Sequence, residues 1–177
     1  VQGEHKCVVC TADEGEPGTF KDRELLTNDP FQLLEGMIIA GWSVGADNGY
    51  IYMREEYSHL RPRLLSAIAQ CEEAGYLGDD ILGSGLNYRI HLYSGAGAYV
   101  CGEGSALAES VEGKAGRPRM KPPFIKQCGV FHLPTCVNNV ESLSLVPPLL
   151  RDDEGYYKSQ GTEDCPGTKM ISVSGNV

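Results

Sequence analysis

The sequence predicts an α/β fold of the Rossmann-like type, with a mainly parallel sheet flanked by helices. Short apolar segments typical of strands alternate along the chain with segments of helical periodicity, which is the order of successive β-α-β units. Two polar turns, one acidic and one rich in glycine, directly follow strand segments. Because ligands of such sheets collect at the carboxyl ends of the strands, both turns are candidate binding elements.

The first half of the chain supplies two strands and the first helix. Residues 6–11 form a short apolar run and predict the first strand. Asp29 followed by Pro30 is typical of a helix start, and an apolar stripe over residues 33–40 continues that helix. Residues 50–53 predict the second strand.

The second half repeats the alternation. Helical spacing of apolar residues over 60–75 predicts a second helix, residues 88–93 a third strand, and residues 105–111 a third helix. Residues 138–150 predict a further helix that ends near two consecutive prolines, and residues 169–177 predict a last strand.

Composition limits the possible partners. With 177 residues, 41% of them hydrophobic, the chain is long enough for one sizeable core. A net charge of -9 argues against nucleic-acid binding, which needs clustered Lys and Arg. No apolar run approaches the ~18–20 residues of a membrane span, and the start lacks the features of a signal peptide. We expect a cytoplasmic protein that does not insert into membranes.

Seven cysteines with irregular spacing suit reduced thiols better than a disulfide framework. Cys7 and Cys10 form the single C-x-x-C pair. Val8 and Val9 between them indicate a buried strand, where cysteine behaves as a small hydrophobic residue. We therefore expect no metal site in this chain, and a thiol or metal protein built on this pair is the weakest alternative.

The glycine-rich segment GAGAYVCGE spans residues 95–103 and precedes a helix. Glycines allow close backbone approach to a ligand, and the first N–H groups of a helix lack intrahelical partners. The segment is a candidate phosphate or cofactor site, with an ordinary tight turn as the alternative. It differs from the dinucleotide fingerprint because its third glycine follows the second by five residues.

The acidic turn contains Asp13, Glu14 and Glu16. Carboxylates accept hydrogen bonds from hydroxyl and ring N–H donors but repel phosphate, so this turn would face the polyol or ring part of a cofactor. A solvated turn is the alternative. A calcium or magnesium site is disfavoured because the D-x-D-x-D register is missing.

Residues 113–135 form a long connection that carries Lys114, Arg117, Arg119 and Lys121 ahead of Phe124. This basic loop would attract phosphate groups, and its aromatic end would stack on a planar ring, unless the loop is merely a solvated surface.

Asn138 and Asn139 begin the helix predicted after the basic loop. Asparagine is favoured at helix starts as a cap. The pair therefore caps a helix, binds phosphate, or does both.

Four strings carry a resemblance to a known family: ADEGEPGTFKDR (12–23), GAGAYVCGE (95–103), PRMKPPF (118–124) and PTCVNNVES (134–142). In this order they resemble the family of FMN-binding, NADH-oxidising subunits of respiratory complex I, the NADH-quinone oxidoreductase. The same module occurs in the diaphorase subunits of NAD-reducing hydrogenases and in NAD-dependent formate dehydrogenases.

The resemblance implies an oxidoreductase activity. NADH would transfer a hydride to FMN, which would pass single electrons to the iron–sulfur clusters of a larger complex. No side chain would be catalytic, because hydride passes between the cofactors. The implied partners are NADH, a thioredoxin-like iron–sulfur subunit and further iron–sulfur subunits, in the peripheral arm of a membrane complex or in a soluble complex.

The resemblance also implies site residues. Those expected to bind FMN are Thr11, Asp13, Glu14, Tyr99, Gly102, Glu103, Val137, Asn138 and Asn139, the last three at the phosphate end. Those expected to face NADH are Glu16, Gly104, Lys121 and Phe124. Residues 1–177 would form an incomplete FMN/NADH-binding domain, an internal fragment of a larger subunit. Its N-terminal glycine-rich loop and its C-terminal iron–sulfur region, with the cluster ligands, would lie outside the chain.

The chain departs from the family pattern at a few positions. Thr11 stands where the family usually has Asn, and Gly104 where it usually has a second Glu. Ile125 replaces a usual Pro. The first two changes support an alternative function, a non-catalytic flavin relay or assembly subunit of the same fold that has lost its NADH site.

Overall fold

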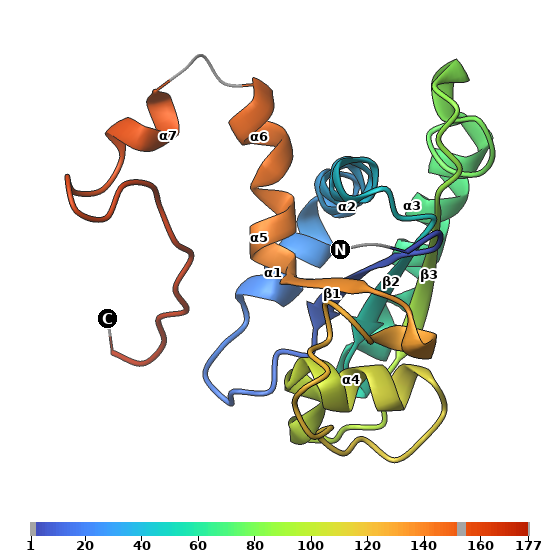
Figure 1. The fold of residues 1–177 in the computed structure, drawn as a ribbon. Coiled ribbons are helices and arrows are strands. Elements are labelled where there is room, and N and C mark those ends of the chain that lie inside the picture. The colour runs from blue at the N-terminus through green and yellow to red at the C-terminus, as the bar shows by residue number, and fades with distance from the viewer. Residues whose placement is uncertain (1–2, 152–154, 177) are drawn as a thin grey trace.

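The computed structural model describes residues 3–151 and 155–176. Its centre is a four-stranded parallel sheet in the order β3-β2-β1-β4 (Figure 1). The strands are β1 (Cys7–Ala12), β2 (Asn48–Met53), β3 (Arg89–Ser94) and β4 (Thr135–Asn139). Helices flank this sheet, which confirms the predicted Rossmann-like α/β class.

Two layers of helices cover the sheet. The α-helices are α1 (Lys21–Asn28), α2 (Pro30–Val44), α3 (Arg61–Glu73), α4 (Gly104–Val111), α5 (Val140–Ser144), α6 (Val146–Arg151) and α7 (Tyr156–Ser159). Apolar side chains of α2, α3 and α5 pack on one face of the sheet, and those of α4 pack on the other (Figure 1). Within the described ranges, the helices are all too short or too polar to cross a membrane.

The start and end of α2 follow the sequence signals. Asp29 caps the helix by accepting a 3.1 Å hydrogen bond from the Gln32 backbone N–H, and Pro30 occupies the first turn. The helix ends at Gly45, whose φ of 67° is left-handed. In the middle of α2, Gly36 lies so close to the Leu143 carbonyl of α5 that a Cβ atom there would clash. The absence of a side chain at Gly36 therefore lets α2 and α5 pack closely against each other.

The strand order creates a crevice beside β1. The chain builds β2 and β3 on one side of β1, then returns across the sheet and places β4 on the other side. The order of strands therefore reverses between β1 and β4. In open parallel sheets, the carboxyl ends of the strands at such a reversal form the usual ligand-binding crevice.

The prediction for residues 138–150 is wrong at its start. Asn138 and Asn139 belong to β4, and the helical region begins at Val140. The strand was missed because it is short and ends in two asparagines, which are depleted in strands. Its pairing with β1 over five consecutive positions outweighs that propensity.

The predicted strand at residues 169–177 is also wrong. Residues 169–176 have no strand structure, and Val177 lies outside the described residues. Hydrogen bonds between backbone and side-chain groups hold this segment instead: the Met170 N–H donates to Glu141 Oε1 at 2.8 Å, and Ser172 Oγ accepts from the Phe20 N–H at 2.9 Å. These tertiary hydrogen bonds replace a strand ladder.

Helix α1 was not anticipated from the sequence. It has few apolar positions, with Leu26 fully buried. Its first-turn N–H groups are capped by Glu14, which lies well before the helix in the sequence. Sequence rules that look for a cap at the adjacent residue do not detect this arrangement.

Candidate functional site

A polar cavity of about 360 Å³ lies at the carboxyl ends of β1 and β4. It therefore occupies the point where the strand order reverses. Its lining residues are Thr11, Asp13, Glu14, Glu16, Thr19, Lys21, Asp22, Gly102, Asn139, Glu141, Ser142 and Lys169. Half of them are residues predicted to bind FMN or NADH. The other half was missed, although Thr19, Lys21, Asp22, Glu141 and Ser142 belong to the strings that carry the family resemblance.

Asp13 is the residue of this cavity best placed to meet a ligand. Its Oδ2 atom is buried and has no hydrogen-bond partner among the described residues. Burial raises the pKa of the carboxyl, while the Arg54 guanidinium partly opposes that rise. Oδ2 lies 4.0 Å from the point that a Cβ on Gly102 would occupy. A buried acceptor beside a side-chain-free backbone suits a ligand that donates a hydrogen bond, such as a hydroxyl or a ring N–H.

Glu14 supports the site from within the protein. Glu14 is 4% exposed, and its carboxylate accepts from the backbone N–H groups of Asp22 and Arg23 at 3.0 and 3.3 Å. The Tyr57 hydroxyl donates to it at 2.8 Å. All three bonds join the acidic turn to neighbouring elements, so the side chain fixes the turn that presents Asp13.

Lys21 is the centre of a buried polar cluster at the other side of the cavity. Its Nζ lies 2.5 Å from Asp22 Oδ1, 2.8 Å from Asn139 Oδ1 and 3.3 Å from Glu141 Oε2. Both carboxylate side chains are nearly inaccessible, at 3% and 6% exposure. Burial lowers the pKa of Lys21, but its hydrogen bonds to these carboxylates raise it above the ordinary value. Lys21 is thus the internal counter-charge for two buried acids.

Asn139 joins β1, α1 and α5 through its side chain. The amide Nδ2 donates to Thr11 O at 3.1 Å and to Asp22 Oδ2 at 2.7 Å. The amide oxygen accepts from Lys21 and from the Glu141 N–H, so Asn139 caps α5 as the sequence suggested. Two donor hydrogens and two lone pairs are therefore all engaged within the protein.

Val137 and Asn138, the neighbours of Asn139 in β4, do not line the cavity. Val137 packs in the apolar cluster under α4, and the amide of Asn138 donates to Cys136 Sγ at 3.2 Å. The structure thus separates the three residues predicted for the phosphate end.

The acidic turn and the glycine-rich segment lie against each other. The ring of Tyr99 packs on Gly15 so closely that a Cβ there would lie 2.6 Å from the ring. The Tyr99 hydroxyl donates to Glu16 Oε1 at 3.2 Å. Gly97 has a φ of 76°, which explains a glycine at that turn. Only Gly102 of this segment lines the cavity.

Glu103 occupies the N-terminus of α4. Its carboxylate accepts from the N–H groups of Ser105 and Ala106, each at 2.9 Å, and forms a 2.9 Å ion pair with Lys121. The expectation that the first N–H groups of this helix are open to a phosphate is therefore corrected. Burial raises the pKa of Glu103, but the bonds from Ser105, Lys121 and Ala106 outweigh it and lower the pKa to about 2.

A Glu103→Gln variant tests this cap through pH. Because the folded-state pKa lies below the ordinary value of 4.5, the cap stabilises the fold above that value and is lost as pH falls toward about 2. We expect the wild type to lose more unfolding free energy than Glu103→Gln across this range. Urea unfolding of both proteins at several pH values measures this loss of unfolding free energy. Parallel losses in the two proteins would contradict the assignment.

The residues expected to face NADH lie around this cap rather than in the cavity, apart from Glu16. Gly104 begins α4, and a Cβ on it would lie 3.3 Å from Ile125 Cδ1. Two departures from the family pattern are thus neighbours in space. Phe124 is half-exposed, with the Lys126 ammonium 6.0 Å from its ring centroid.

The cations of the basic loop are paired mostly within the protein. Arg119 bonds to Glu109 and Glu112 at 2.5 and 2.7 Å, and Lys114 bonds to Glu112 at 2.7 Å. Lys121 is paired with Glu103. These acids offset the positive charge that the sequence placed beside the glycine-rich segment.

The two cysteines of the C-x-x-C pair, Cys7 and Cys10, are buried in β1, as predicted. Burial raises the pKa of both thiols, that of Cys7 to about 11. Both side chains therefore belong to the core of the sheet in their protonated form.

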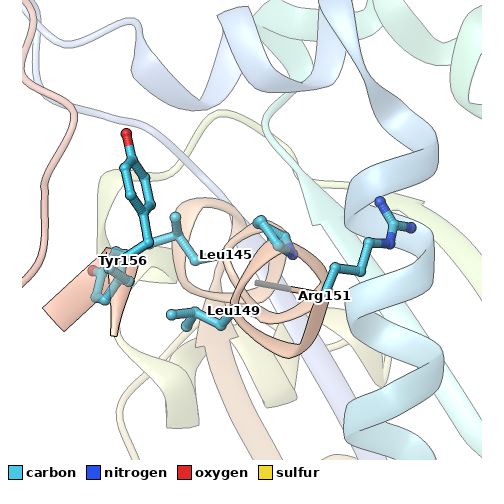
Figure 2. A pocket seen from close by; sticks show the side chains of 6 residues that line it. Leu145, Leu149, Arg151 and Tyr156 are labelled. Carbon is cyan, nitrogen blue, oxygen red and sulfur yellow. The ribbon is translucent and has the colours of Figure 1, made fainter. Parts of the chain in front are cut away.

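A second cavity lies between α6 and α7, away from the strand ends (Figure 2). It is mainly apolar and is lined by Leu145, Pro148, Leu149, Arg151, Tyr156 and Tyr157. Figure 2 shows Arg151 directed toward the neighbouring helix, where it pairs with Glu35 of α2. None of the residues predicted to bind FMN or NADH lines this cavity.

The family model described as the Nuo51 FMN-binding domain matches residues 1–148. The chain belongs to this family. The match covers all four strands and every residue predicted for FMN or NADH.

Curated relatives of this FMN-binding domain belong to two kinds of complex. The chain is 46% identical over 175 residues to an NADH-quinone oxidoreductase subunit of Rhizobium meliloti, covering 99% of this chain and 42% of that protein. It is also 46% identical over 176 residues to the NAD-reducing hydrogenase HoxS subunit alpha of Cupriavidus necator, covering 99% and 29%. The chain thus spans about two fifths or less of these relatives' lengths.

A solved structure supports the same relationship. The crystal structure of an NAD+-reducing [NiFe]-hydrogenase in the H2-reduced state superposes with a TM-score of 0.84 at 44% identity. The superposition covers 92% of this chain and 27% of the hydrogenase chain. The two chains therefore share this fold in three dimensions.

Proposed function

We propose that the protein binds FMN in the cavity at the ends of β1 and β4 and is the flavin-bearing module of an NADH-oxidising complex. The observation that carries the proposal is the buried Oδ2 of Asp13, which has no hydrogen-bond partner among the described residues and belongs to a residue that lines this cavity, within a domain of the FMN-binding family. An acceptor of this kind is stabilised when a ligand donates to it.

Different residues of the site would contact different parts of the ligands. Asp13, Thr11 and the Gly102 backbone suit the polyol and ring donors of a flavin. Glu16 lines the same cavity and accepts a hydrogen bond from Tyr99, and these two residues would guide a second, dinucleotide ligand. When bound, FMN would supply hydride acceptance from NADH and single-electron release. This chain's own contribution is to position the two ligands and to exclude water between them.

Partners follow from the same proposal. Relatives named as subunits of a quinone oxidoreductase and of a hydrogenase support a place in a multi-subunit complex. The electrons would leave toward iron–sulfur subunits, a thioredoxin-like one among them, in a cytoplasmic assembly. NADH would be the donor.

Flavin titration tests the first step. We expect the protein to quench FMN fluorescence with one-to-one stoichiometry and to be stabilised against heat by FMN. Adenosine monophosphate, which has a phosphate but no flavin, is the control and should give no thermal shift of similar size. Unquenched FMN with a folded protein would refute flavin binding.

One observation favours the second candidate, a flavin relay without an NADH site. Gly104 presents no carboxylate, and Ile125 fills the adjacent space. NADH added anaerobically to the FMN-loaded protein separates the two functions. Prompt bleaching of the flavin supports NADH oxidation, whereas tight FMN that stays oxidised supports the relay.

A further inference from the structure

Arg54 directly follows β2 and is not among the described residues that line the flavin cavity. Its side chain is mostly buried, at 20% exposure. Its backbone N–H donates to the Ala12 carbonyl at 3.2 Å, and its guanidinium Nη1 donates to the Glu14 carbonyl. These two carbonyls belong to the residues directly before and after Asp13. A single arginine therefore holds the backbone on both sides of the residue that carries the buried acceptor.

The guanidinium of Arg54 is itself fixed by two further side chains. Its Nε and Nη2 atoms donate to Glu56 Oε2 and Oε1 at 3.0 and 2.7 Å, a two-point contact that sets the plane of the group. Its Cζ atom lies 5.4 Å from the centre of the Tyr57 ring, and the Tyr57 hydroxyl donates to the Glu14 carboxylate at 2.8 Å. Contacts with three residues thus determine where the positive charge lies.

Glu56 connects this arrangement to the glycine-rich segment. Its Oε1 atom lies 3.9 Å from the point that a Cβ on Gly97 would occupy. The Gly95 N–H donates to the Met53 carbonyl at 2.7 Å, next to Arg54 in the chain. Arg54 and Glu56 therefore join the acidic turn to the glycine-rich segment.

Arg54 also acts on Asp13 through its charge. Burial disfavours the charged form of the Asp13 carboxyl, and the carboxylates of Glu56 and Glu16 disfavour it further, so its pKa is raised. The positive charge of Arg54 opposes this rise. Tyr52 is a further titratable group near this carboxyl, and burial raises the pKa of its phenol, which therefore stays neutral. Arg54 is thus the cation that offsets the buried negative charge of Asp13.

We infer that Arg54 is a positioning residue of the flavin cavity, which acts through Asp13 by holding the backbone on both sides of it and by offsetting its negative charge. This inference rests on the proposed function, because Asp13 is the acceptor assigned there to the flavin. Without the guanidinium, the acidic turn loses its bond at the Glu14 carbonyl, and Asp13 becomes neutral at a higher pH. Arg54 itself does not contact the ligand.

A double-mutant cycle separates an action through Asp13 from a general loss of structure. Dissociation constants of FMN are measured by fluorescence quenching for the wild type, Arg54→Met, Asp13→Asn and the double variant. In the wild-type background, Arg54→Met should weaken FMN binding ~10-fold, because the carboxylate loses both its placement and its counter-charge. In the Asp13→Asn background, the same change should weaken binding by about twofold or less. Arg89→Met removes an exposed arginine paired with Asp79 at 2.8 Å and is the matched control, which should leave FMN affinity unchanged.

The pH dependence of FMN affinity is the second measurement. Arg54→Met should raise the pH at which affinity falls on acidification, because Asp13 is then protonated at a higher pH. Arg54→Lys keeps the cation and should retain the wild-type midpoint. The phosphate of FMN titrates with every variant, so its contribution is common to all of the profiles.

The outcomes distinguish this inference from the proposed function. Equal losses of FMN affinity in the two backgrounds, or an unchanged midpoint in Arg54→Met, overturn the role of Arg54 while leaving flavin binding intact. If Arg54→Met does not fold, the same cycle is measured with Arg54→Lys, which lacks the two-point contact with Glu56, and equal losses again overturn the role. If the folded wild type does not bind FMN, the proposed function itself fails, and the role of Arg54 fails with it.

Discussion

A Lys21→Met variant is expected to lose ~3–5 kcal/mol of unfolding free energy, the usual cost of removing one partner from a buried ion pair. Lys21 lies between two carboxylates that are 3% and 6% exposed, and methionine would leave both without a cation. Asn139 would also lose a hydrogen bond to its amide oxygen. Urea unfolding followed by circular dichroism gives the difference directly.

The pH dependence of this loss identifies its cause. Burial already raises the pKa of Asp22, opposed by the hydrogen bonds from Lys21 and Asn139. Without Lys21 that pKa rises further, so mild acid protonates the carboxyl and removes the buried charge. The destabilisation should therefore be smaller at pH ~4.5 than at pH ~7. Lys158→Met on the surface is the control and should change stability by less than about 0.5 kcal/mol. A loss independent of pH would point to packing instead.

An Asp13→Asn variant is expected to bind FMN ~10–100-fold more weakly, which corresponds to the ~1.5–3 kcal/mol of a hydrogen bond to a charged group. Asparagine keeps the shape but removes the negative charge. The same change should stabilise the flavin-free protein, because the buried Oδ2 has no internal partner to lose. Opposite signs for ligand affinity and stability are the expected signature of a binding residue.

The pH dependence of the unfolding free energy adds a second test of Asp13. Its folded-state pKa is raised by burial, so its contribution to the stability of the flavin-free protein is present at low pH and is lost as pH rises through that pKa. Asp13→Asn should remove this decline. Asp79→Asn, at an exposed carboxylate paired with Arg89, is the matched control and should leave FMN affinity unchanged. Loss of both affinity and stability in Asp13→Asn would contradict a ligand-facing role.

Local chemistry made most of the fold predictable. Asp29 and Pro30 marked the start of α2, and period-two or continuous apolar runs marked β1, β2 and β3. The missed strand β4 forms through pairing with β1, which local propensity does not contain. Helix α1 was missed for a related reason, because its cap comes from Glu14 across a turn.

The site was predictable in its location but not in its internal partners. Carboxylates at the end of the first strand predicted a binding element there, and the structure has a cavity at that position, which Asp13 lines. Glu14 and Asn139 also line it, but their hydrogen-bonding groups are engaged by the protein. A residue type shows what a side chain can bond to, whereas only the packed structure shows which of those bonds are already made.

The position of β4 beside β1 has a consequence for how the protein folds. Thr11 and Asn138, 127 residues apart, share a hydrogen bond where these strands meet. Contacts of such long sequence separation form slowly, because the intervening chain must first be ordered. During synthesis the cavity therefore cannot form until Asn139 has left the ribosome. Until then, the carboxylates of the acidic turn are exposed to water. A cofactor that binds there would stabilise the folded state only after β4 has paired with β1.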